Sequence, residues 1–211
     1  MKLTWLNKWN VLPLAIILAG AAGGTRVYAQ SPSGQSQPSS DPDKIHDRKE
    51  NQQDRIAQGV KSGQLTAGET ANLENKEANI NTETRDDRKA NGGKLTAGEK
   101  AQINRQQNHL SNQIYDDKHN ANTAHYGNNE VGQRRENQQD RIAQGVKSGQ
   151  LTPRETSNLE NKESAINHEV GADRKANGGK LTPGEKAKVN RQQNRTSRQI
   201  YRDKHNGRTA K

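Results

Sequence analysis

Near the C-terminus, four arginines are spaced four, three and four residues apart: Arg191, Arg195, Arg198 and Arg202. On a helix, this spacing places them along one face. A basic helix face can dock on nucleic acid, on anionic lipid headgroups or on envelope polyanions such as lipopolysaccharide. A solvated face without a partner is the plainer interpretation of this stripe, and polyanion binding is its candidate function.

Positive charge is concentrated in the same half of the chain, whose formal net charge is +10. Residues 134–211 hold eighteen Lys or Arg against nine Asp or Glu, whereas residues 48–133 hold twelve of each. An internal duplication relates the two halves, and its first copy has other residues at the four stripe positions: Arg105, His109, Asn112 and Asp116. The fold therefore does not require the stripe, which favours a role in binding.

Four glutamates close repeated loops and are the candidate metal ligands: Glu69, Glu99, Glu155 and Glu185. Each loop resembles the second half of an EF-hand, whose last Glu binds calcium with both oxygens. The other side-chain ligands of an EF-hand are missing. At the first, third and fifth loop positions, two loops carry Gln, Val and Ser, and the other two carry Arg, Ala and Gly. Weak binding of calcium or another divalent cation is the alternative function, and otherwise no cofactor is expected.

The sequence predicts no catalytic site. None of the six His residues has a His partner at the i, i+4 spacing of a helical zinc site, and His119 and His125 form at most a weak metal pair. The Gly-Gly-Lys-Leu-Thr segments that begin at Gly92 and Gly178 lack the Ser or Thr that follows Lys in a phosphate-binding loop. We expect a protein that is not an enzyme.

A loop motif that recurs four times positions these residues: Gly-[Gln/Lys]-Leu-Thr-[Ala/Pro]-[Gly/Arg]-Glu, at 63–69, 93–99, 149–155 and 179–185. Its Gly suits the left-handed conformation that ends a helix. Its Thr and the Glu three residues later form the capping box that starts the next helix. Each motif therefore predicts the end of one helix and the start of another.

Residues 50–66 recur at 136–152, an offset of 86 positions that extends to the Ile-Tyr pairs at 114 and 200. Apolar residues at helical spacing predict an all-α fold, a tandem duplication of a three-helix unit with EF-hand-like helix-loop-helix turns. Two small domains and one elongated helical array both fit the pattern. The expected helices are 46–61, 67–89, 97–119, 134–147, 153–175 and 183–205.

The duplicated segments resemble uncharacterised secreted bacterial helical repeat proteins. The shared pattern is Asn-Gln-x-x-Arg-Ile-x-x-Gly-Val-x-Ser-Gly-x-Leu-Thr-x-x-Glu, followed by Ser-x-x-Ile-Tyr-x-x-Lys-His. It occurs here at Asn51–Glu69 with Ser111–His119, and at Asn137–Glu155 with Ser197–His205. The resemblance implies a secreted helical protein and names no activity.

The ends of the chain predict export. Residues 1–29 have the basic start, apolar stretch and Val-Tyr-Ala end of a signal peptide, and they leave no integral membrane segment once removed. The remaining segments are a Ser/Pro/Gln-rich tether at 30–45, helical repeats at 46–119 and 134–206, a linker at 120–133 and a basic tail at 207–211. The expected protein is periplasmic or secreted, and it binds an envelope polyanion or another protein, or serves a structural role.

Overall fold

The four repeated loops end and start helices as the motif predicts. In a computed structural model that describes residues 42–210, Gly63 and Gly149 both adopt a φ of 71°, in the left-handed region. Each following Thr accepts a hydrogen bond from the backbone N–H of the Glu three residues on, and that Glu accepts one from the Thr backbone. The capping boxes start at Thr66, Thr96, Thr152 and Thr182.

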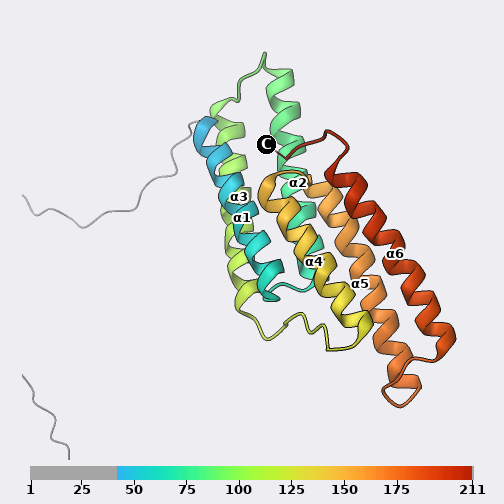
Figure 1. The fold of residues 1–211 in the computed structure, drawn as a ribbon. Helices are drawn as coiled ribbons and strands as arrows, with labels where there is room; N and C mark the ends of the chain where they lie inside the picture. Colours follow the sequence, from blue (N-terminus) through green and yellow to red (C-terminus); the bar gives the residue numbers. More distant parts are fainter. Residues whose placement is uncertain (1–41, 211) are drawn as a thin grey trace, which may run out of the picture. The chain divides into compact units, whose positions relative to one another are not determined.

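The described residues are all-α, with six helices in the expected order (Figure 1). The helices are α1 Pro42–Ser62, α2 Ala67–Ala90, α3 Ala97–His119, α4 Glu130–Ser148, α5 Pro153–Ala176 and α6 Pro183–Lys204. The expected signal peptide at 1–29 and most of the tether at 30–45 lie outside the described residues.

Two helices begin four residues earlier than expected. The start of α1 at Pro42 includes the end of the predicted tether. The start of α4 at Glu130 includes the end of the predicted linker, because the Asn129 side chain accepts a hydrogen bond from the Gly132 backbone N–H at 3.1 Å and caps the helix.

Four helices, α1, α2, α4 and α5, form the centre of the described unit (Figure 1). Helix α2 packs most extensively on α5, and α1 packs on α4, so the largest helix contacts join the two copies of the duplication. Helix α3 covers α1 and α2 on one side, and α6 covers α4 and α5 on the other. The two copies thus share one compact unit.

The apolar core crosses the boundary between the copies. Ala57 of the first copy packs in the cluster built around Ile142 and Leu159, and Ala143 packs in the cluster built around Ile56 and Leu73. The Ser157 hydroxyl donates to the Ala71 carbonyl at 3.1 Å, and these two residues are equivalent positions of the duplication. Equivalent points of α2 and α5 therefore meet each other.

Buried glutamines replace the aromatic side chains that this core lacks. The Gln52 side-chain amide donates to the Gln107 carbonyl at 2.7 Å and to the Ser111 hydroxyl at 2.9 Å, which ties α1 to α3. The Gln107 amide in turn donates to the Ile45 carbonyl at 2.9 Å. The second copy repeats all three bonds through Gln138 and Gln193.

Close packing of Leu65 and Leu151 requires a glycine in the preceding helix. A Cβ on Gly59 would lie 2.6 Å from Cδ1 and 2.7 Å from Cγ of the fully buried Leu65. We expect Gly59→Ala to lower the free energy of unfolding by about 1–3 kcal/mol, because Leu65 must leave its position.

Urea denaturation followed by circular dichroism measures this loss. The matched control is Gly98→Ala, since no heavy atom lies within 4 Å of a Cβ at that helical position. Equal stabilities of the two variants would contradict the packing argument.

Candidate functional site

The arginine stripe lies on the outer face of α6. All four guanidinium-bearing residues, Arg191, Arg195, Arg198 and Arg202, are exposed. Within residues 42–210, none of their side chains donates a hydrogen bond or forms an ion pair, although Arg202 is close enough to Asp203 for their charges to interact. Other basic residues of this copy do have partners, such as Lys188, whose Nζ lies 2.9 Å from a Glu169 oxygen. The stripe charges are thus available to a partner.

The equivalent face of α3 shows that this arrangement is specific to one copy. Residues 105, 109, 112 and 116 are exposed in the same way, but only Arg105 carries a positive charge and Asp116 carries a negative one. Beside each face, an exposed Tyr stacks on the His four residues later, with ring centroids 4.1 Å apart for Tyr115 and 4.2 Å apart for Tyr201. The two faces therefore differ in charge and not in backbone structure.

The candidate metal ligands are engaged in the helix caps. One Glu69 oxygen accepts from the Thr66 backbone N–H at 2.9 Å, and the other accepts from the Asn120 and Asn122 amides at 2.8 and 3.0 Å. Burial alone would raise the pKa of Glu69, but these hydrogen bonds lower it below its ordinary value. Glu155 is held in the same way by Thr152 and Asn206.

The other two candidate ligands, Glu99 and Glu185, cap α3 and α6. The hydrogen bonds from the Thr96 and Thr182 backbone N–H groups lower their pKa values. Both oxygens of each also accept from a side-chain amide, that of Asn91 or Asn177. Among residues 42–210, no three His, Cys, Asp or Glu side chains gather where they could hold a metal ion. The structure thus places these four glutamates at separate helix ends.

The segments after α3 and α6 return to the loops that precede α2 and α5. The Ala124 backbone N–H donates to the Gly63 carbonyl at 2.8 Å, and the Ala210 N–H donates to the Gly149 carbonyl at 2.9 Å. The predicted linker and the described part of the basic tail are therefore attached to the helical unit by equivalent hydrogen bonds.

Four glutamates that sequence reasoning missed lie in the α2–α5 contact. Glu74, Glu77, Glu160 and Glu163 are all buried, with exposed fractions of 0%. The side-chain amides of Gln53 and Gln139 donate to Glu74 and Glu160 at 3.1 and 2.9 Å. Both oxygens of Glu163 accept no hydrogen bond within the described residues. The signal was present: Glu77 lies between Leu73 and Ile80 on the same helix face.

Burial raises the pKa of each of these carboxyl groups. The pKa is about 8 for Glu160 and about 7 for Glu163 and Glu77, where the nearby charges of Arg135 and Lys49 partly oppose the effect of burial. The pKa of Glu74 is also raised well above its ordinary value, through burial and the nearby negative charges of Glu77 and Glu160. The folded protein therefore holds protons on these groups that the unfolded chain releases.

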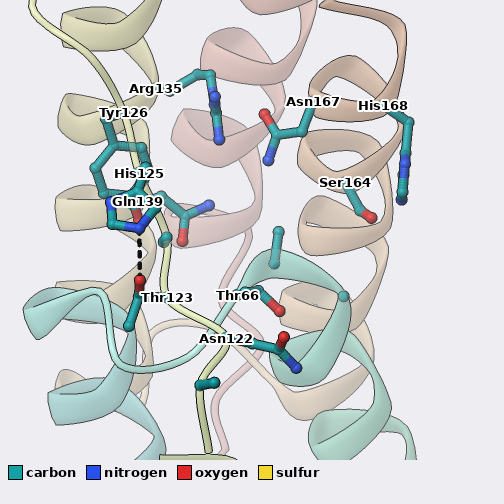
Figure 2. Close-up of a pocket in the computed structure, with 14 residues that line it drawn as sticks. Thr66, Asn122, Thr123, His125, Tyr126, Arg135, Gln139, Ser164, Asn167 and His168 are labelled. Atoms are coloured by element: carbon teal, nitrogen blue, oxygen red, sulfur yellow. Dashed lines mark hydrogen bonds between the residues drawn. The ribbon is translucent and has the colours of Figure 1, made fainter. Parts of the chain in front are cut away.

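A cavity of about 640 Å³ lies beside this contact, where the two copies meet (Figure 2). Its walls are the start of α2, the segment 121–126, and helices α4 and α5. Figure 2 shows Arg135 of α4 and Asn167 of α5 pointing toward one another, with Thr66 and Asn122 at the opposite end. Most of the residues that line it are polar, and sequence reasoning missed the cavity because it exists only once the copies pack together.

The raised pKa values predict that unfolding depends on pH. Because the folded pKa values exceed the ordinary glutamate value of 4.5, stability is greatest near that pH and falls as pH rises through 7–8. We expect the free energy of unfolding to drop by about 2 kcal/mol or more between pH 5 and pH 8.5.

Urea denaturation at these two pH values measures the drop in the free energy of unfolding. The drop should be smaller in the double variant Glu77→Gln and Glu163→Gln, because neither amide titrates. An unfolding free energy that stays constant or rises from pH 5 to pH 8.5 would show that these carboxyls are not buried.

Comparison with protein-family models, curated proteins and solved structures finds no match for this chain. None of the helices within residues 42–210 is long and apolar enough to cross a membrane.

Proposed function

We propose that this chain is an exported, non-enzymatic binding protein that docks on anionic polymers of the cell envelope through the α6 arginine stripe. The observation that carries the proposal is the presence of four exposed guanidinium groups on one helix face, none of which donates a hydrogen bond or forms an ion pair within the described residues. Export rests on the signal-peptide pattern at 1–29.

The geometry of the stripe suits a polymer with repeated anionic groups. From Arg191 to Arg202 the helix rises about 16 Å, so the four charges form a row and not a single cluster. Guanidinium groups bind phosphate and carboxylate oxygens in a bidentate manner, and an extended partner can contact several of them at once. The capping glutamates carry no comparable proposal, because their oxygens already accept hydrogen bonds in the helix caps.

The duplication supplies a variant that should remove binding and keep the fold. Replacing stripe residues with their first-copy counterparts lowers the net charge by four, one unit each at 195 and 198 and two at 202: Arg195→His, Arg198→Asn and Arg202→Asp. We expect this variant to leave a heparin column at a clearly lower salt concentration than the unmodified protein, since fewer counterions are released on binding.

A second variant controls for the overall charge by removing four positive charges from exposed lysines elsewhere: Lys61→Gln, Lys89→Gln, Lys147→Gln and Lys175→Gln. Its elution should stay close to that of the unmodified protein. Equal shifts in the two variants would indicate nonspecific attraction and would overturn the proposal. Binding to vesicles with and without lipopolysaccharide then tests the envelope partner directly.

A further inference from the structure

The cavity between the copies has the size of a small-molecule site. Its volume of about 640 Å³ lies within the range of ligand pockets. It opens between the start of α2, which belongs to the first copy, and Arg135, Ser164 and His168, which belong to the second (Figure 2). The cavity and the α6 stripe have no residue in common.

Three buried polar atoms on the cavity wall have no hydrogen-bond partner within the described residues. They are the Tyr126 hydroxyl oxygen, the Arg135 Nε and the Asn167 Oδ1. A buried polar group without a partner destabilises a protein, so such groups are normally satisfied. Burial raises the pKa of Tyr126, so its hydroxyl stays protonated and can donate. All three atoms belong to residues that line the cavity.

The duplication shows that the cavity is open at a place where the equivalent surface is covered. In the equivalent place at the start of α5, Pro153 and Arg154 stand where the cavity has Ala67 and Gly68. The Arg154 guanidinium there donates to the Thr82 hydroxyl at 3.4 Å and covers the surface. Gly68 has no side chain to do this, and a Cβ at that position would lie 3.6 Å from the Ser164 hydroxyl oxygen.

The second copy also differs in the residues that face the cavity. Lys49, Ala78 and Thr82 of the first copy correspond to Arg135, Ser164 and His168. On the side of the cavity, Ser164 adds a hydroxyl group. Arg135 and His168 place planar groups there that can form hydrogen bonds in a fixed geometry. The cavity is therefore left uncovered at Gly68, and its wall carries polar groups that the equivalent surface lacks.

Arg135 determines the class of ligand. Its guanidinium lies over the Tyr126 ring, 5.3 Å from the centroid, and is partly buried. Glu163 is the opposing charge closest to it, but the two groups form no ion pair. A guanidinium with a free Nε matches a carboxylate, and the remaining wall offers neutral hydroxyl, amide and imidazole groups from Ser164, Asn167 and His168.

We propose that this cavity binds a small carboxylate that also carries hydroxyl or amide groups, with the carboxylate on Arg135 and the neutral groups on Ser164 and Asn167. Sugar acids and N-acylated amino acids share this chemistry.

Isothermal titration of the full chain at pH 6 tests the proposal with two matched pairs of probes. The pairs are D-glucuronate with D-glucuronamide, and N-acetylalanine with N-acetylalaninamide. The members of each pair differ in the carboxylate, so we expect at least one acid to bind at least tenfold more tightly than its amide. The acid that binds identifies the source of the carboxylate. Absence of binding by both acids, or equal binding of acid and amide, would overturn the proposal.

Variants taken from the duplication locate the binding. Gly68→Arg places in the cavity the side chain that covers the equivalent surface, and it should abolish binding. Arg135→Lys should weaken binding at least tenfold, and Arg154→Gly should leave it unchanged. If Gly68→Arg fails to fold, Ser164→Ala with His168→Thr takes its place, because the first copy folds with these residues. Unchanged affinity in the cavity variants would contradict the site.

Discussion

The packing of α2 against α5 is the contact on which the rest of the structure depends. It joins the two copies, brings Ala71 and Ser157 together and buries Glu74 and Glu160 beside it. A chain with so few large apolar side chains cannot bury enough apolar surface within one three-helix unit. The core of each copy therefore includes an alanine from the other copy, Ala57 or Ala143. Polar side chains are buried beside these cores.

Both proposed binding surfaces lie where the two copies differ. The hydrogen bonds of Gln52 and Gln107 recur 86 residues later, so the positions that hold the fold together are shared by both copies. The α6 stripe and the cavity beside Gly68 break this equivalence, because one copy has Asp116 where the other has Arg202, and Gly68 where the other has Arg154. Duplication has left one copy of each position free to carry function without loss of the fold.

The sequence predicted the helices well because the Gly, Thr and Glu of each loop determine where the helices end and begin. The start of α4 was missed because its cap, Asn129, lies in a stretch rich in Asn that is also typical of a linker. The arginine stripe was visible from spacing alone. Glu77 also lies on the apolar face of its helix, but its burial was not inferred because glutamate is rarely buried. The cavity was not visible, because it forms only when the two copies pack together. The apolar stripes of the helices are narrow, so the sequence did not show whether the two copies pack together.

Separating the two copies tests whether each one depends on the other to fold. Residues 42–126 alone would expose the α2 face that α5 covers, together with Glu74 and Glu77. We expect this fragment to be unfolded, or to melt with a concentration dependence that shows self-association, when circular dichroism and light scattering are measured together. A monomeric fragment that melts cooperatively at the same temperature as residues 42–210 would contradict the account, since each copy would then fold without the other.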